Sequence, residues 1–155
     1  MSTRRSFLIA LAGAPMAATS LHAEEQLPIM TIHKDPSCGC CQTWAERLAE
    51  AGFRFRVVEN KSMNRLKAQL GVPQRLASCH TAEIAGYVIE GHVPPAEIQR
   101  LLREKPQALG LAVPGMPVNS PGMEVPGAED ETYNVVLFGK SRESVFARYS
   151  GSKRI

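Results

Sequence analysis

The sequence has no large excess of charge of either sign. Its 155 residues include 18 Lys and Arg against 15 Asp and Glu, a formal net charge of +3, and only 6% of them are aromatic. Arg4 and Arg5 lie in an N-terminal stretch that we expect to be removed, which leaves the mature chain almost neutral. This balance excludes a strongly basic nucleic-acid-binding protein and an acidic disordered tail.

Long apolar runs are also missing after residue 23. A membrane-spanning helix needs about 18 or more consecutive apolar residues, and no such run follows the N-terminal stretch. We therefore expect no membrane span in the mature chain. Because 44% of the residues are hydrophobic, the chain can form one domain with a core of its own.

Residues 1–23 have the pattern of an export signal. Arg4 and Arg5 precede an Ala- and Leu-rich stretch over residues 7–21, and Ala23 is a small residue at the expected cleavage site. The paired arginines followed by Ser-Phe-Leu are similar to a twin-arginine signal, which exports folded proteins. An ordinary secretory signal that happens to contain two arginines is the alternative. Either route predicts a periplasmic protein, in a compartment where disulfides persist.

Strands and helices are predicted to alternate over residues 27–105. Short apolar or alternating runs indicate the strands, and apolar residues at helical spacing indicate the helices. The predicted strands are 27–33, 53–57, 81–85 and 87–90, and the predicted helices are 41–51, 63–70 and 95–105. This α/β pattern, βαβαββα, is typical of a thioredoxin-like fold, whose site lies in the loop between the first strand and the first helix.

Prolines and glycines interrupt every pattern over residues 106–131. No helix or central strand is expected there, and a loop of this length is usually functional or disordered. A closing β-hairpin is predicted around Gly139, and the tail from 151 to 155 is expected to be loose. We therefore divide the mature chain into a thioredoxin-like domain, 27–105, and a Pro/Gly/Met-rich C-terminal extension, 106–150, packed on the same domain.

Three of the four cysteines lie together at the predicted site loop. Cys38 and Cys41 have the CxxC spacing of a dithiol redox pair, and Cys40 is an extra thiol between them. The N-terminus of a helix stabilises a thiolate. Three thiolates also concentrate soft negative charge, which selects Cu(I), zinc or an iron–sulfur cluster.

The fourth cysteine, Cys79, precedes the third predicted strand, in the loop that usually carries a cis-proline in thioredoxin-like folds. No proline lies between Pro73 and Pro94, which counts against general thiol–disulfide exchange. We expect Cys79, together with His80, to join the other cysteines as metal ligands. A disulfide between Cys79 and one of the other cysteines is the alternative.

Two methionines strengthen the prediction of a metal site. Met116 and Met123 each follow Pro-Gly in a loop too polar to need core methionines. Thioethers bind Cu(I) well and zinc poorly, so this pair favours copper. The alternative is that both side chains fill hydrophobic gaps between the loop and the domain.

The other candidates are weaker. His33 is expected on the surface of the first strand, and His92 in a surface turn, with metal contact by His92 as the less favoured alternative. Trp44 is expected to anchor the core, and Arg54 and Arg56 to lie on a solvated strand face.

Several segments resemble the CopG family of exported bacterial proteins. They are PSCGCC at 36–41, SCHTA at 78–82, GYVIEGHVP at 86–94 and residues 110–124, and the resemblance covers most of residues 28–149. It implies a thioredoxin-like domain with a C-terminal extension that binds copper, serves copper resistance and interconverts Cu(I) and Cu(II). The ligands that it implies are Cys38, Cys40, Cys41 and Cys79, joined by Met116 and Met123. Asn119, where many relatives have glycine, has no obvious consequence for ligation.

Residues and resemblance together predict a periplasmic copper-resistance protein that holds Cu(I) in cysteine thiolates. Its expected partners are copper ions and a periplasmic copper efflux or handling system, without nucleic acid, and we expect a monomer. One alternative is a dithiol–disulfide oxidoreductase with Cys38 as nucleophile and Cys41 as resolving thiol. The other is a [2Fe–2S] carrier on four cysteines. The methionines favour copper over both, and the missing proline counts against the first.

Overall fold

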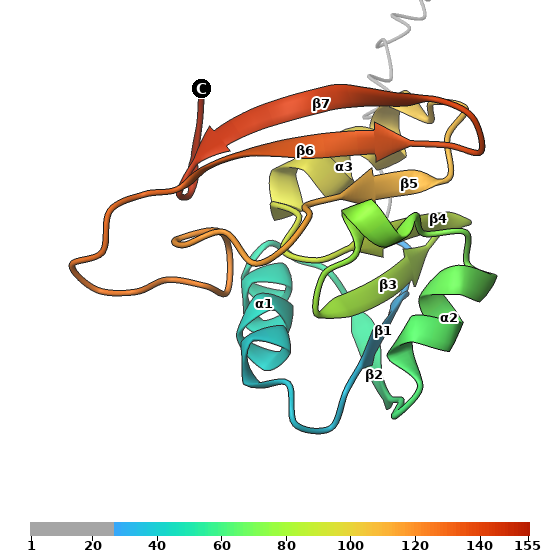
Figure 1. The fold of residues 1–155 in the computed structure, drawn as a ribbon, viewed down its shortest axis with the longest axis horizontal. Helices are drawn as coiled ribbons and strands as arrows, with labels where there is room; N and C mark the ends of the chain where they lie inside the picture. The colour runs from blue at the N-terminus through green and yellow to red at the C-terminus, as the bar shows by residue number, and fades with distance from the viewer. Residues whose placement is uncertain (1–26) are drawn as a thin grey trace, which may run out of the picture.

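The computed structural model describes residues 27–155, so the export signal expected at residues 1–23 lies outside the described residues. The described chain forms one eight-stranded mixed sheet with three α-helices (Figure 1). No helix in residues 27–155 is long and apolar enough to cross a membrane.

The first part of the described chain alternates strands and helices in the expected order. Its elements are β1 (Met30–Lys34), α1 (Gly39–Glu50), β2 (Phe55–Glu59), α2 (Met63–Gln69), the short 3-10 helix η1 (Gln74–Leu76), β3 (His80–Ile84), β4 (Tyr87–Glu90) and α3 (Pro95–Glu104). β2 begins two residues later than predicted. Phe53 lies instead in the short connection between α1 and β2, where its side chain is buried in the core.

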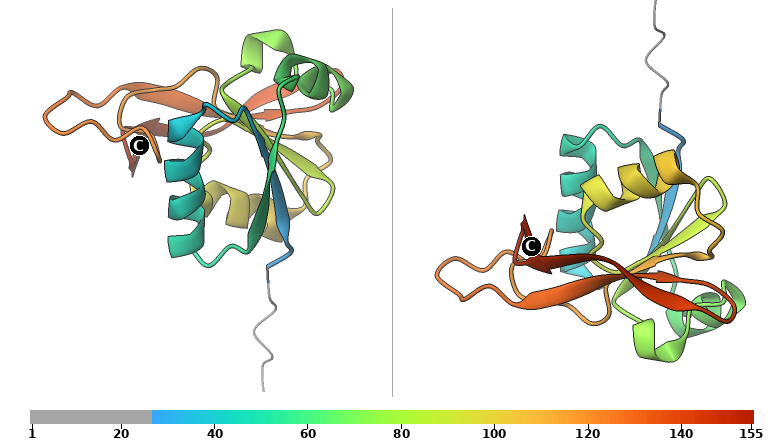
Figure 2. Two further views of the ribbon diagram at one scale, coloured as in Figure 1. Left: turned by 90° about the horizontal axis from the view of Figure 1, so that it is seen from below. Right: turned by 90° about the horizontal axis from the view of Figure 1, so that it is seen from above.

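The strands follow the spatial order β2-β1-β3-β4-β5-β6-β7-β8. β1 pairs parallel with β2 and antiparallel with β3, which brings the loop after β1 and the loop before β3 to the same end of the sheet. α1 and α3 lie together on one face, and α2 lies beyond the other (Figure 2). Ile89 packs with Trp44 of α1 in one core cluster, whereas Val88 packs with Leu76 of η1 in a second. Successive strand residues point to opposite faces, so the sheet has a core on each side.

The expectation that no central strand runs through residues 106–131 is wrong. β5 (Gly110–Ala112) pairs parallel with β4 and antiparallel with β6 (Thr132–Phe138), in the middle of the sheet. A Cβ atom at position 110 would lie 1.7 Å from the carbonyl oxygen of Val88, so glycine permits this close pairing. The prolines at 106 and 114 bound the strand rather than prevent it.

The predicted closing hairpin is confirmed, since β6 pairs antiparallel with β7 (Glu143–Ser150). The tail is not loose, however. β8 (Lys153–Arg154) pairs with β7, and the N–H of Ile155 donates to the carbonyl of Arg148 at 2.9 Å. The sequence pattern did not indicate this strand because it has only two residues and both are exposed.

Candidate metal centre

The loop between β1 and α1 presents three cysteines at the start of α1. Cys38 occupies the N-cap position of this helix. The carboxylate of Asp35 accepts hydrogen bonds from the Ser37 hydroxyl at 2.5 Å and the Ser37 N–H at 2.9 Å, and these bonds lower the pKa of Asp35. The buried Lys34 donates to the carbonyl oxygens of Asp35 and Pro36. Hydrogen bonds within Asp35–Ser37 and from the Lys34 side chain therefore hold this loop in place just before Cys38.

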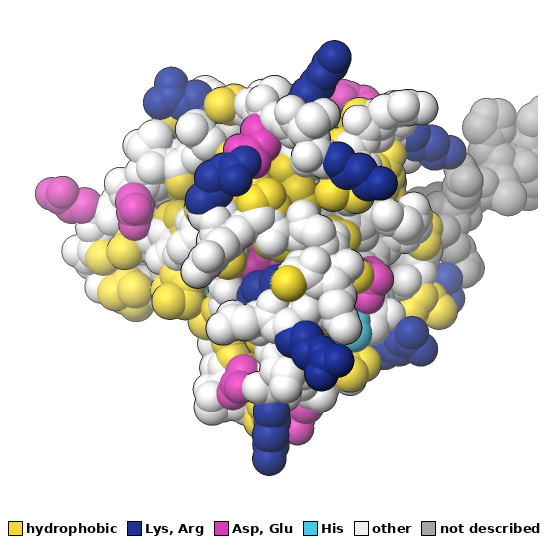
Figure 3. Space-filling view, turned by 45° about the vertical axis from the view of Figure 1, so that its right-hand side comes forward, with side chains coloured by type: hydrophobic (Ala, Val, Ile, Leu, Met, Phe, Trp, Pro, Cys, Tyr) yellow, Lys and Arg dark blue, Asp and Glu magenta, His cyan; other side chains and the backbone are white. Residues whose placement is uncertain are grey.

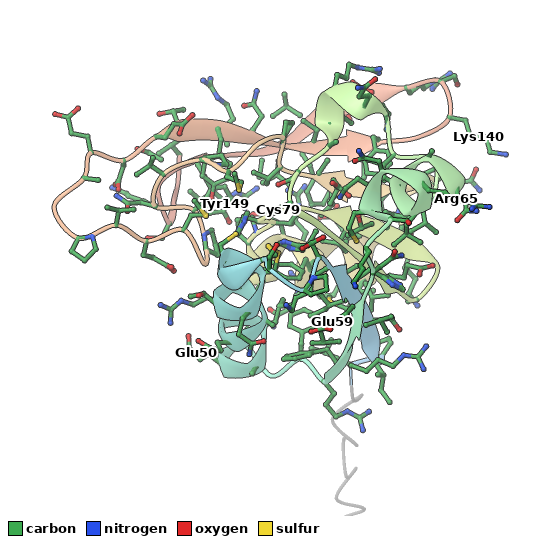
Figure 4. The ribbon with its side chains drawn as sticks, turned by 60° about the horizontal axis from the view of Figure 1, so that its bottom comes forward. Glu50, Glu59, Arg65, Cys79, Lys140 and Tyr149 are labelled. Carbon is green, nitrogen blue, oxygen red and sulfur yellow. A yellow bond between two sulfur atoms is a disulfide. The ribbon has the colours of Figure 1, made fainter. Side chains whose placement is uncertain are left out.

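All four cysteines come together, as the sequence predicted. Cys40 Sγ lies 3.7 Å from Cys38 Sγ and 3.8 Å from Cys79 Sγ. Cys38 and Cys41 form a disulfide, whereas Cys40 and Cys79 are free thiols. The disulfide thus joins the CxxC pair and does not involve Cys79. Figure 4 shows Cys79 beside the N-terminal end of α1.

Two histidines form a second donor group around Cys79. Cys79 Sγ lies 3.2 Å from Nδ1 of His80 and 3.1 Å from Nε2 of His92. Both imidazoles are fully buried. Burial, followed by the neighbouring His92, lowers the pKa of His80 well below its usual value, and burial lowers that of His92. Both rings therefore favour the neutral form, which is the form that binds metals.

The expectation that His92 lies on the surface is wrong, because its exposed fraction is 0%. The carbonyl oxygen of Pro121, in the C-terminal extension, lies 2.9 Å from His92 Nδ1. A carbonyl can only accept, so Nδ1 carries the proton and Nε2 directs a lone pair toward Cys79. The extension both buries His92 and sets its tautomer. The only indication of this role in the sequence is that His92 closely follows a strand.

Trp44 is a core residue, as expected, and it also supports the site. Its ring is fully buried, with its centroid 4.2 Å from that of His80. Its Nε1–H donates to the carbonyl of Val93, one residue after His92, at 3.0 Å. His33 lies apart from this site, and its Nε2 is 3.0 Å from a carboxylate oxygen of Glu83 on β3.

The donor set suits a soft metal ion. Burial, together with the nearby Cys40, raises the pKa of Cys79 to about 12, so its thiol keeps its proton until a cation replaces it. Nε2 of His80 is buried without a hydrogen-bond partner in the described structure. The sulfurs of the four cysteines lie within 4.8 Å of one another, and so do the donor atoms of Cys79 and the two histidines. Cys79 belongs to both groups.

The Pro-Gly-Met repeat is attached to the site at both of its copies. Before Met116, the carbonyl of Gly115 accepts a hydrogen bond from the Ser78 hydroxyl, next to Cys79. Before Met123, Gly122 packs so closely on α1 that a Cβ atom would lie 2.7 Å from the backbone nitrogen of Trp44. The side chain of Met116 is 52% exposed, so it fills no gap in the core, and that of Met123 is half-buried.

A buried ion pair that sequence reasoning missed lies behind the Cys79 loop. Lys67 Nζ donates to Glu90 Oε1 at 2.5 Å and to Thr81 Oγ1 at 2.8 Å. Glu90 also accepts the N–H of Ser78 at 2.7 Å and the hydroxyl of Thr81 at 2.6 Å. Burial raises the pKa of Glu90, and these donors oppose the rise. This network fixes the backbone just before Cys79 through the Ser78 N–H, and it holds the side chain of Thr81 just after it.

Fold and site together define an α/β protein whose partly buried cluster of cysteines and histidines offers the donor atoms of a soft-metal site. Among solved structures, the chain is similar to "Copper resistance protein copG- Form 2", with 43% sequence identity and a TM-score of 0.75, over 79% of this chain and 98% of that one. It is equally similar to "Copper resistance protein copG- Form 1", with the same identity and TM-score, over 81% and 99%. The chain belongs to the CopG family of copper resistance proteins.

A match to a family model is consistent with this membership. The family described as "Protein of unknown function, DUF411" matches residues 76–123. That segment contains Cys79, both site histidines and both methionines of the repeat. None of the curated proteins matches the chain. The relatives and the cysteine cluster together support a copper-related role.

Proposed function

We propose that this protein binds Cu(I) in the periplasm as part of copper resistance. The observation that carries the proposal is the position of Cys79, whose sulfur lies 3.1 to 3.8 Å from donor atoms of His80, His92 and Cys40. Cys38 and Cys41 add two thiolates when their disulfide is reduced. The copper resistance proteins of 43% identity support copper as the metal.

The donor types favour Cu(I) over other common ions. Thiolate and thioether sulfur are soft ligands that select Cu(I), and imidazole also binds copper. Zinc accepts cysteine and histidine but gains little from methionine, and Met116 and Met123 each follow a glycine anchored at the site. We therefore assign the ligands to the four cysteines, His80 and His92, completed by these two methionines.

We assign residues 27–105 to a thioredoxin-like domain and residues 106–150 to an extension of it. The element order βαβαββα, with the CxxC pair at the start of α1, supports this assignment. Residues 1–23 have the sequence pattern of a twin-arginine export signal, which supports the periplasm as the location. A periplasmic copper efflux or handling system is the proposed partner of a monomeric protein.

Interconversion of Cu(I) and Cu(II) is a second proposed activity, and the Cys38–Cys41 disulfide supports it. Reduction of a disulfide to two thiols takes up two electrons and two protons. Oxidation of two Cu(I) ions to Cu(II) releases two electrons, and solvent supplies the protons.

The same disulfide favours one alternative, a dithiol–disulfide oxidoreductase in which Cys38 attacks and Cys41 resolves. A [2Fe–2S] carrier lacks a comparable observation, because Cys79 is surrounded by two imidazoles as well as thiols.

The test of the proposed function is an anaerobic titration of the reduced mature protein. We expect the protein to take Cu(I) from a chromophoric chelator and to keep it in the presence of equimolar Zn(II). The matched control is the Cys38→Ser/Cys41→Ser variant, which should bind Cu(I) more weakly because it lacks two thiolates. Wild-type binding no stronger than that of this variant would contradict the proposal.

The two methionines make a separate prediction. Changing Met116 and Met123 to leucine is expected to leave the protein folded, since such swaps usually cost less than about 1.5 kcal/mol. We expect Cu(I) affinity to fall by about 10-fold, the low end of what disturbing a metal site costs. Met30→Leu, the same change in the buried core, is the control and should leave affinity unchanged. An unaltered titration of the folded double variant would remove the methionines from the site.

A further inference from the structure

A cleft of about 530 Å³ opens beside Cys79. It lies between the loop after β1, the segment that begins α2 and the loop before β3. The residues that line it are Asp35, Lys61, Ser62, Met63, Asn64, Arg65, Lys67, Ser78 and Cys79. A cavity of this volume is within the range of sites that hold small molecules.

The cleft gives access to Cys79 from a side that the extension leaves open. On the extension's side, Gly115 is bonded to Ser78, and Pro121 is bonded to His92. These contacts cover the histidine half of the site. A ligand that exchanges copper with the sulfur of Cys79 can therefore reach it through the cleft, from the side of α2.

The rim of this cleft is positively charged. Lys61 and Arg65 are exposed, and neither takes part in an ion pair within residues 27–155. Lys67 is neutralised by Glu90, and Asp35 is the one carboxylate in the lining. Figure 3, which turns the α2 side toward the viewer, shows Lys and Arg side chains projecting from this face.

This charge has a consequence for the form in which copper arrives or leaves. A cationic copper complex is repelled by the rim, whereas an anionic complex or chelator is attracted and concentrated at it. Met63 lines the same cleft, and its thioether is a neutral, soft ligand that does not oppose this selection.

We propose that this cleft is the exchange route of the copper centre and that its basic rim selects small anionic Cu(I) ligands. The proposal rests on the proposed function and names the class of ligand that serves it. The step is a ligand exchange, in which the Cu–S bond to Cys79 breaks, a proton returns to the thiol and the anionic ligand takes up Cu(I). The oxidation state of copper does not change.

The experiment measures how fast two chelators withdraw Cu(I) from the copper-loaded protein under anaerobic conditions. Bathocuproine disulfonate is anionic, and neocuproine has the same chelating ring system without charge. In Lys61→Glu/Arg65→Glu, we expect withdrawal by the anionic chelator to slow by about 10-fold or more at low salt, the lower bound of electrostatic steering. Withdrawal by neocuproine should stay within a factor of about two, and added salt should remove the difference.

The matched control is Arg103→Glu/Lys105→Glu, which changes the net charge equally. Arg103 lies in the last turn of α3 and Lys105 is its C-cap residue, on the face of the sheet opposite α2, and both are exposed. This variant should withdraw copper at the wild-type rate. Equal slowing by both pairs, or no slowing by Lys61→Glu/Arg65→Glu, would overturn the exchange route. Failure of the wild type to bind Cu(I) in the titration would instead contradict the proposed function.

Discussion

Replacing Cys79 by serine is expected to lower Cu(I) affinity by about 100-fold or more, a larger loss than replacement of Cys40 causes. Changes in groups that only orient metal ligands cost 10- to 100-fold in affinity, and a lost ligand costs more. Cys79 is the one residue shared by the four-cysteine group and the cysteine–histidine group. Its removal therefore disrupts both groups at once, whereas Cys40 belongs to one.

The measurement is competition with a chromophoric Cu(I) chelator, carried out on reduced Cys79→Ser, Cys40→Ser and wild type. Serine has nearly the volume of cysteine, and Cys79 is only partly buried, so we expect all three proteins to fold alike. Far-ultraviolet circular dichroism checks this. Equal losses of Cu(I) affinity in the two variants would show that His80 and His92 add nothing to copper binding. An unchanged Cu(I) affinity in Cys79→Ser would remove Cys79 from the site.

The parts of the site that could be predicted are those with a local signal. The CxCC motif follows a strand and opens a helix, so the spacing of Cys38, Cys40 and Cys41 alone places them together. Cys79 has no local signal of this kind, and only the expected thioredoxin-like fold placed the loop before the third strand beside the CxxC pair; the antiparallel pairing of β1 with β3 brings Cys79 there. Secondary structure over residues 27–105 was predictable because period and stop residues are local features.

The parts that were missed depend on contacts between distant residues. His92 is hydrogen-bonded to Pro121, 29 positions later, and Lys67 pairs with Glu90, 23 positions later. From the sequence alone, a lysine on a short helix and a glutamate at the end of a strand are expected on the surface. Only tertiary packing brings Lys67 and Glu90 together. β5 was missed because prolines were interpreted as barriers, although seven residues without proline separate Pro106 from Pro114.

Replacing Glu90 by leucine is expected to destabilise the protein by about 3 to 5 kcal/mol, the cost of removing one partner from a buried ion pair. Lys67 would keep its charge in a site where it is almost fully buried, and the N–H of Ser78 would lose its acceptor. Urea unfolding of the copper-free, reduced protein measures the loss. The loop that carries Cys79 would lose its support at the same time, so Cu(I) affinity should also fall in the folded fraction.

Two further variants separate the buried charge from the loop support. Lys67→Met/Glu90→Leu removes both charges and should recover most of the free energy of unfolding, because apolar replacements of a buried pair are often neutral. Neither apolar side chain can accept the N–H of Ser78, so this double variant should stay weaker in Cu(I) binding than wild type. Glu90→Gln retains an acceptor for Ser78 and should bind Cu(I) better than Glu90→Leu does. Full copper affinity in the stable double variant would show that Glu90 contributes to stability alone and does not position Cys79.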